Sequence, residues 1–132
     1  MIKIMITVLL TALFVGESHV QNDELTKSMA RGKVIYTDFC ITCHKPTGEG
    51  TPKFFPPLAM SDFLVKNRTE SIKSAKFGQK GKIVVNGIDY NGLMPNPGLT
   101  DEEVVDVMNY VLNSWGNTSD KIVTLEEVKA LK

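Results

Sequence analysis

The chain has 132 residues, which is room for one domain of ordinary size with a core large enough to fold alone. Basic and acidic side chains balance at 15 each, so the bulk charge gives no reason to expect a nucleic acid or an anionic membrane as partner. The charges are unevenly placed: residues 45–82 hold eight basic and three acidic side chains, and residues 100–132 hold seven acidic and three basic ones. Such an asymmetry can orient a protein towards a charged partner, although two solvated faces would give the same pattern.

Residues 1–18 have the pattern of a secretory signal peptide. Lys3 precedes the apolar residues 4–15, and Gly16 and Ser18 place small side chains before a possible cut ahead of His19. A cut ahead of Gln21 fits as well. We therefore expect a periplasmic or otherwise exported protein with no membrane span after cleavage. A retained anchor is the alternative, although the apolar run is short for about 30 Å of hydrocarbon.

A helix is predicted from about residue 24 towards Cys40, with Asn22 or Asp23 as its N-cap. Its apolar side chains recur at three- and four-residue spacing, at Leu25, Met29, Val34, Ile35, Tyr36 and Phe39. Gly32 lies inside this helix, where glycine costs about 1 kcal/mol relative to alanine. The glycine therefore indicates the close approach of another element.

Cys40, Cys43 and His44 form the pattern C-x-x-C-H, which is typical of covalent attachment of a c-type haem. The two thiols can add to the two vinyl groups as thioethers, and the adjacent imidazole can bind the iron as the proximal ligand. A thiol–disulfide redox pair, half of a zinc site and a structural disulfide are the alternatives. The redox pair usually follows a strand in a βαβ pattern, which does not precede Cys40. Zinc needs about four ligands, and the chain has two cysteines and two histidines in all.

The middle of the chain predicts short helices at residues 61–66 and 69–77, with Phe63, Leu64, Ile72 and Phe77 facing the haem. Residues 82–90 carry β-branched side chains on both sides of Asn86-Gly87, the strongest short signal for a β-hairpin. We therefore expect a small all-α protein with one short β-hairpin near residues 82–90.

Four methionines are candidates for the distal iron ligand. Met29 and Met108 lie in helical patterns, and Met60 is interpreted as packing. Met94 lies fifty residues after His44, in a segment that we expect to be irregular and stiffened by two prolines. Ligation by histidine and methionine raises the reduction potential and suits electron transfer. Met94 is therefore the predicted distal ligand.

The last long helix begins at a capping box, with Thr100 as its cap and Glu103 three residues on. We expect its buried stripe to run from Val104 to Trp115 and the helix to end at Gly116. Residues 124–131 repeat the Thr-x-x-Glu start and predict a short amphipathic helix of open purpose.

Gly32, Tyr36 and the C-x-x-C-H residues resemble the first helix and haem motif of class I cytochromes c. Tyr90-Asn91-Gly92-x-Met94-Pro95 resembles the methionine loop of bacterial members. The resemblance covers residues 28–116 and implies the class I cytochrome c fold around one covalent haem c, with residues 24–117 as the domain and 118–132 as a tail. It also implies that the first and last helices cross at Gly32, with an aromatic pair Tyr36 and Tyr110. In this family a proline carbonyl accepts the second N–H of the proximal histidine, a role that falls on Pro56 in Pro56-Pro57-Leu58.

The function implied by the resemblance is that of a periplasmic, monomeric electron carrier which exchanges single electrons with redox protein partners and is not itself an enzyme. Segments near Pro56 and Trp115 are similar to cytochrome domains found with nitrite reductases and other periplasmic oxidoreductases. A dedicated electron-transfer subunit of such a complex is therefore the first alternative. A haem sensor or peroxidase-like protein with an open iron site and a haem-free thiol oxidoreductase are the others.

Overall fold

The structure is a computed structural model that describes the backbone of residues 2–132 and the side chains of residues 21–132. The predicted signal peptide, its cleavage site and His19 lie outside the residues whose side chains are described. Within the described part of the chain, no helix combines the length and the apolar character needed to cross a membrane.

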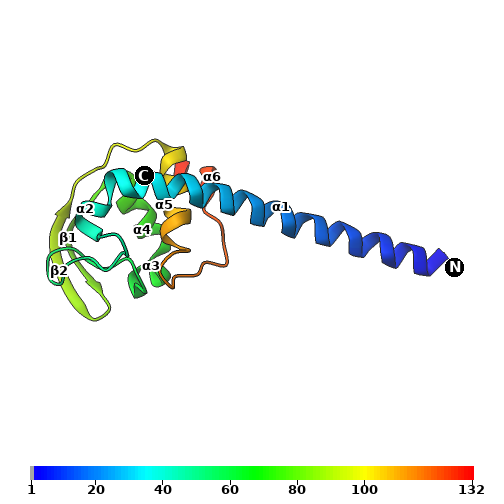
Figure 1. The fold of residues 1–132 in the computed structure, drawn as a ribbon, viewed down its shortest axis with the longest axis horizontal. Helices are drawn as coiled ribbons and strands as arrows, with labels where there is room; N and C mark the ends of the chain where they lie inside the picture. Colours follow the sequence, from blue (N-terminus) through cyan, green and yellow to red (C-terminus); the bar gives the residue numbers. More distant parts are fainter. Residues whose placement is uncertain (1) are drawn as a thin grey trace.

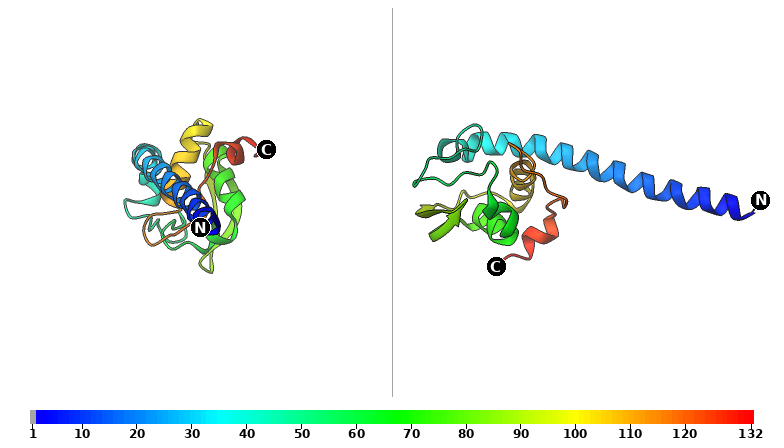
Figure 2. Two further views of the ribbon diagram at one scale, coloured as in Figure 1. Left: turned by 90° about the vertical axis from the view of Figure 1, so that its right-hand side faces the viewer. Right: turned by 90° about the horizontal axis from the view of Figure 1, so that it is seen from below.

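The elements follow one another as α1 (Ile2–Phe39), α2 (Ile41–His44), α3 (Asp62–Lys66), α4 (Arg68–Phe77), β1 (Gln79–Val85), β2 (Ile88–Met94), α5 (Asp101–Val111) and α6 (Leu125–Lys129). The helices gather on one side of a two-stranded sheet, and the N-terminal part of α1 projects away from them (Figures 1 and 2). The predicted N-cap at Asn22 or Asp23 is wrong, because α1 passes through both residues without a break. The class expected from the sequence, helices with one small hairpin, is confirmed.

The crossing of α1 and α5 depends on Gly32. A Cβ atom added to Gly32 would overlap the backbone carbonyl of Asp106 and would lie 2.8 Å from Cβ of Tyr110. Next to this contact, the ring centroid of Tyr36 lies 5.6 Å from that of Tyr110 and 4.9 Å from that of Trp115. The close approach predicted from a glycine inside a helix is confirmed, and so is the aromatic packing beside it.

Polar side chains fix the same two helices in register. The Arg31 guanidinium donates to both carboxylate oxygens of Asp106, at 2.6 and 2.8 Å. Ser28 Oγ donates to Asp106 at 2.7 Å and accepts from Asn109 Nδ2 at 2.9 Å. Ser28, Asp106 and Asn109 are all buried. Because buried polar groups are costly unless they are paired, this network favours one alignment of α1 on α5.

Helix α5 supplies much of the core. Its N-terminus has the predicted capping box, with Thr100 and Glu103 bonded reciprocally. Its buried apolar side chains are Val104, Val107, Met108 and Val111. The helix ends at Val111 rather than near Gly116. Beyond it, the Ser114 hydroxyl donates to the carbonyl of Tyr110 at 2.6 Å, a side-chain bond to the backbone that competes with helix continuation.

The hairpin is longer than predicted. β1 and β2 pair in antiparallel register from Gln79↔Met94 to Val85↔Ile88. Asn86 and Gly87 both have positive φ, 51° and 76°, as the tight turn of a two-residue hairpin requires. Met94 is therefore the last residue of a strand, and the expectation that it lies in an irregular segment is wrong. The irregular part of the chain starts after it.

Candidate functional site

A large cavity lies between α2, the loop that follows it, α4, the hairpin and α5. Cys40, Cys43, His44, Pro56 and Met94, the residues selected from the sequence, all line it. The space inside measures about 1140 Å³, part of it open to solvent. Most other lining side chains are apolar, among them Phe54, Phe55, Leu58, Phe63, Ile83, Val85, Leu93, Leu99, Val107 and Val111.

The two cysteines reach the cavity from one helical turn. The backbone N–H groups of Cys43 and His44 both donate to the carbonyl of Cys40, at 3.2 and 3.0 Å. Both thiols are free. Burial, with a smaller contribution from the neighbouring Cys43, raises the pKa of Cys40 to about 11. A reactive redox cysteine needs a lowered pKa, so this environment argues against the thiol–disulfide alternative.

The imidazole of His44 is oriented by the loop that follows it. His44 is 8% exposed, and its Nδ1 lies 3.0 Å from the carbonyl oxygen of Pro56. Because a carbonyl can only accept, Nδ1 carries the proton and Nε2 keeps a free lone pair. Burial lowers the pKa of His44, an effect that the Pro56 hydrogen bond opposes. The neutral ring is the form that binds a metal ion.

Glycines shape the loop that carries Pro56. The N–H of Gly50 donates to the carbonyl of His44 at 3.0 Å, and a Cβ atom on Gly50 would lie 2.7 Å from the carbonyl oxygen of Pro56. Gly48 accepts from the N–H groups of Leu58 and Ala59, at 2.7 and 2.9 Å. Both glycines have φ near +65°, which other residues rarely adopt. The loop therefore turns back on the haem motif and holds the Pro56 carbonyl beside His44.

Two of the four candidate methionines line the cavity. Met94 ends β2 and is half-buried, and Met108 lies on α5 with 4% exposure. Met60 is 69% exposed and, like Met29, is not part of the lining. Of the four candidates, Met94 and Met108 are therefore the two that border the cavity.

Several polar side chains that line the cavity were not predicted, and some of the predicted lining residues lie elsewhere. Ser71, Ser74, Gln79 and Tyr90 line the cavity, as does the expected Phe63, whereas Leu64 and Ile72 pack in the core and Phe77 is 45% exposed. The hairpin register explains part of the miss. Residues alternate between the two faces of a strand, so Gly81, Ile83 and Val85 of β1 lie on the cavity face, as do Gly92 and Tyr90, the β2 partners of Gly81 and Ile83. A strand assignment that began at residue 79 would have included Gln79.

The zinc alternative finds no support in the part of the chain that the structure describes. There, no group of three or more histidine, cysteine, aspartate or glutamate side chains is arranged to hold a metal ion. A C-x-x-C pair with one histidine is short of the four ligands of a structural zinc site.

Comparison with known sequences assigns the family. The Cytochrome c family profile matches residues 29–115. The chain belongs to the cytochrome c family. It is 38% identical over 117 residues to a cytochrome c-552 of Thermus thermophilus, an alignment that covers 82% of this chain and 78% of that protein.

Two other relatives of this cytochrome c are longer proteins, and the chain matches only part of each. It is 29% identical over 115 residues to the cytochrome c subunit of a quinone alcohol dehydrogenase from Gluconacetobacter polyoxogenes, covering 76% of this chain and 22% of the subunit. It is also 29% identical over 123 residues to the gluconate 2-dehydrogenase cytochrome c subunit of Pantoea cypripedii, covering 85% of this chain and 27% of that subunit.

Cytochromes c hold haem covalently and transfer electrons, and the cavity of this cytochrome c fits one such group. It offers two thiols at C-x-x-C spacing, a neutral imidazole, thioether sulfurs and apolar walls in one continuous space. Each of these features meets a requirement of haem c: covalent tethers, axial ligands and exclusion of water.

Proposed function

We propose that the protein is an exported monohaem cytochrome that carries single electrons. In this proposal Cys40 and Cys43 would hold the haem through thioethers, and His44 and Met94 would bind its iron. The observation that carries it is that all four side chains line the same apolar cavity. Residues 1–18 are proposed to be the cleaved leader, residues 24–117 the haem domain and residues 118–132 its tail.

Bound haem c supplies the iron that changes oxidation state, and the protein side chains fix its surroundings. The Pro56 carbonyl holds the Nδ1 proton and with it the orientation of His44. Met94 is restrained by the Gln79 pairing on one side and by Pro95 on the other. A ligand pair that both oxidation states keep limits structural rearrangement, and apolar walls favour the less charged, reduced iron.

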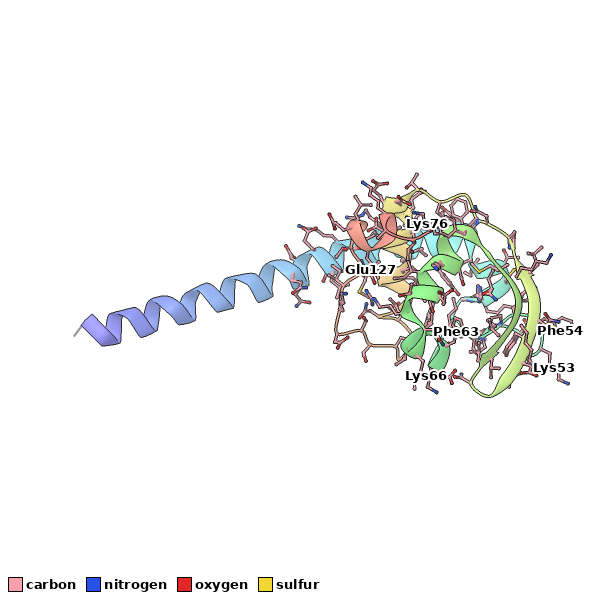
Figure 3. All side chains as sticks on the ribbon, turned by 180° about the vertical axis from the view of Figure 1, so that it is seen from behind. Lys53, Phe54, Phe63, Lys66, Lys76 and Glu127 are labelled. Atoms are coloured by element: carbon pink, nitrogen blue, oxygen red, sulfur yellow. The ribbon has the colours of Figure 1, made fainter. Side chains whose placement is uncertain are left out.

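A redox partner is proposed to dock where the cavity reaches the surface. Phe54 and Leu93 line the cavity and are 72% and 68% exposed, respectively. Exposed Lys53 precedes Phe54, and exposed Lys80 pairs with Leu93 in the hairpin. Figure 3 places Lys53 and Phe54 at the end of the molecule opposite the projecting helix. This apolar edge with basic neighbours suits a partner with an acidic rim around its own electron-exchange site.

The ligand assignment is tested with Met94→Ala in the haem-loaded protein. The variant should keep its covalent haem by mass but lose the methionine–iron charge-transfer band of the oxidised form, and when reduced it should bind carbon monoxide. Met108→Leu is the matched control, because Met108 also lines the cavity, and it should keep the band. An unchanged Met94→Ala spectrum would show that Met94 is not the ligand. Loss of the band in Met108→Leu alone would assign the ligand to Met108.

A dedicated subunit of a dehydrogenase is the second candidate, favoured by the similarity to two dehydrogenase cytochrome c subunits. Size-exclusion chromatography of a native extract distinguishes the two functions. A free carrier elutes at the size of this domain, whereas a subunit elutes with its enzyme.

A further inference from the structure

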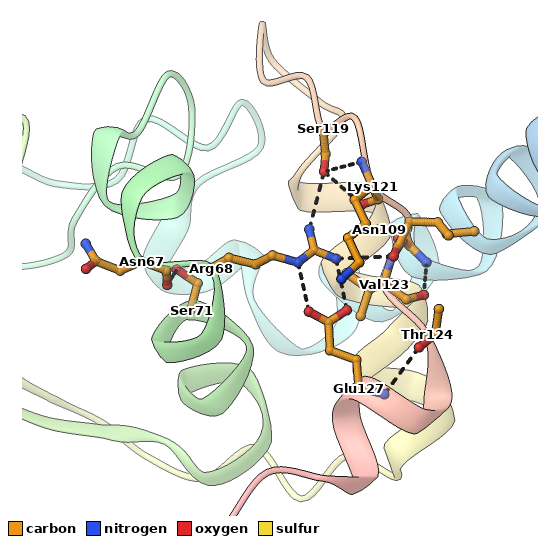
Figure 4. Close-up of polar contacts among 10 residues, drawn as sticks. Asn67, Arg68, Ser71, Asn109, Ser119, Lys121, Val123, Thr124 and Glu127 are labelled. Atoms are coloured by element: carbon orange, nitrogen blue, oxygen red, sulfur yellow. Dashed lines mark hydrogen bonds and ion pairs between the residues drawn. The ribbon is translucent and has the colours of Figure 1, made fainter.

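Helix α4 is held at its N-terminal end by the C-terminal strap, which we define as residues 118–132. Arg68, the first residue of α4, donates through Nε and Nη2 to the two carboxylate oxygens of Glu127, at 2.8 and 3.0 Å. The same guanidinium reaches the carbonyl of Ile122 at 3.2 Å and the hydroxyl of Ser119 at 3.3 Å (Figure 4). The side chains of Arg68 and Glu127 are only 23% and 22% exposed, so this bidentate ion pair is stronger than an ordinary surface ion pair.

The strap also holds the C-terminal end of α4. Lys76 Nζ donates to the carbonyl of Val128 at 2.9 Å and lies 2.8 Å from a carboxylate oxygen of Asp101 at the start of α5. Lys76 is 15% exposed. Figure 3 shows Lys76 and Glu127 on neighbouring parts of the same side of the molecule.

The strap itself is anchored to α5. Val123 and Val128 are 1% and 0% exposed and belong to the core. Asn109 of α5 donates to the carbonyl of Val123 at 3.1 Å and accepts from its N–H at 2.7 Å. The strap therefore ties both ends of α4 to α5, the helix that crosses α1.

The C-terminal end of helix α4 lies against the backbone of Met94. Gly78 ends the helix, and a Cβ atom there would lie 2.6 Å from the carbonyl oxygen of Met94 and 2.7 Å from the N–H nitrogen of Asn96. The next residue, Gln79, is the strand partner of Met94. On its inner side, α4 lines the cavity with Ser71, Ser74 and Ala75. A movement of α4 would therefore move the backbone of Met94 as well as one cavity wall.

We propose that Arg68, Lys76 and the C-terminal strap are positioning elements that keep the Met94 sulfur on the iron. The inference rests on the proposed role of Met94 as distal ligand. A tethered ligand stays bound in proportion to its effective concentration at the metal, which falls when the tether gains freedom. Without the strap, α4 and the start of β1 would open locally more often, and an added ligand would replace the sulfur faster.

The test adds imidazole to the oxidised, haem-loaded protein. The measured quantity is the rate at which imidazole displaces the methionine sulfur, followed as the loss of the methionine–iron band. Glu127→Gln keeps the shape of the side chain but removes the charge that faces Arg68. Its displacement rate should rise about tenfold, as should that of Lys76→Gln, a factor equivalent to about 1.4 kcal/mol. The double exchange Arg68→Glu with Glu127→Arg should restore a rate close to that of the unmodified protein.

Lys82→Gln is the matched control, because Lys82 forms an equally short ion pair with Asp89, 2.8 Å, on the outside of the hairpin, where both are 62% exposed. Its rate should not change. Equal rates in Glu127→Gln and the unmodified protein would overturn the inference even if the melting temperature falls, because the strap would then be structural only. If Lys76→Gln does not fold, Glu127→Gln still decides. If the unmodified protein lacks the methionine–iron band, the assignment of Met94 as ligand is wrong, and the inference about the strap, which rests on it, is wrong as well.

Discussion

Single residues set the close contact between α1 and α5, and Gly32 is the clearest case. Helix propensity and packing act in opposite directions there. Alanine would favour an isolated helix by about 1 kcal/mol, but its methyl group would overlap the backbone of Asp106 in α5. Backbone atoms of a packed helix cannot rotate away as a side chain can, so we expect the overlap to dominate.

Gly32→Ala should lower the free energy of unfolding of the haem-loaded protein by about 1–3 kcal/mol, the usual cost of overpacking. Denaturant titration measures it. Lys33→Ala, at the next, exposed position of the same helix, is the control and should change stability little. A more stable Gly32→Ala variant would show that propensity outweighs the contact and that α1 can shift on α5.

The site residues that lie close together in the sequence were the easiest to predict from it. Cys40, Cys43 and His44 lie on one helical turn, so their spacing alone places them together. Met94 had to be chosen among four methionines by the character of its segment, and the cavity narrows this choice to Met94 and Met108. Gln79 and Ser74 line the cavity but belong to no sequence motif. Their place on the cavity wall follows from strand register and helix packing, which a single sequence defines poorly.

At the scale of elements, the start of α5 was predictable and its end was not. Thr100 and Glu103 signal the start because the capping box is a local pattern of four residues. The apolar stripe continues to Trp115, but the helix stops at Val111 and Trp115 has φ of +54°. A tertiary contact accounts for the difference. The Trp115 ring packs on Gly48, where an added Cβ atom would lie 2.6 Å from it.

The strap adds a pH dependence to stability. The Arg68 guanidinium beside Glu127 lowers the pKa of that carboxyl in the folded protein. The contribution of the pair to the free energy of unfolding is therefore complete above the unfolded-state pKa of about 4.3 and is lost as the pH falls through the lower folded-state pKa.

In the Glu127→Gln variant the side chain at this position does not ionise, so it adds no such pH dependence. The unmodified protein should be the more stable of the two by a constant amount between about pH 6 and 8, and this difference should shrink below about pH 4. Denaturant unfolding of both haem-loaded proteins across that range measures it. Asp89→Asn, at the exposed ion pair with Lys82, should differ little from the unmodified protein at any of these pH values. A difference for Glu127→Gln that persists unchanged in acid would show that the carboxylate charge is not what stabilises the strap.

At the scale of the whole molecule, the haem cavity lies inside the core instead of beside it. Val107 and Val111 of α5 belong to the core cluster and also line the cavity, as does Ala75 of α4. The same helices that close the fold therefore form the haem walls. A core built in this way depends on its contents, because walls that enclose an empty space lose both apolar burial and packing contacts.

The double variant Cys40→Ser with Cys43→Ser removes both attachment points with little change in size, so it tests that dependence. Made together with a working cytochrome maturation system, it should have the mass of the polypeptide alone and should lack the cooperative unfolding transition of the haem-loaded protein. The free-energy cost of a cavity grows with the volume that stays empty, and walls held by α4 and α5 can relax only in part, so we expect this cost to be large relative to the stability of an ordinary domain. Met94→Ala is the control, because it removes an axial ligand but keeps the thioethers, and it should still unfold cooperatively. A double variant that is free of haem and still unfolds cooperatively would show that the helices can close on themselves, and that the cavity is a binding pocket and not a part of the core.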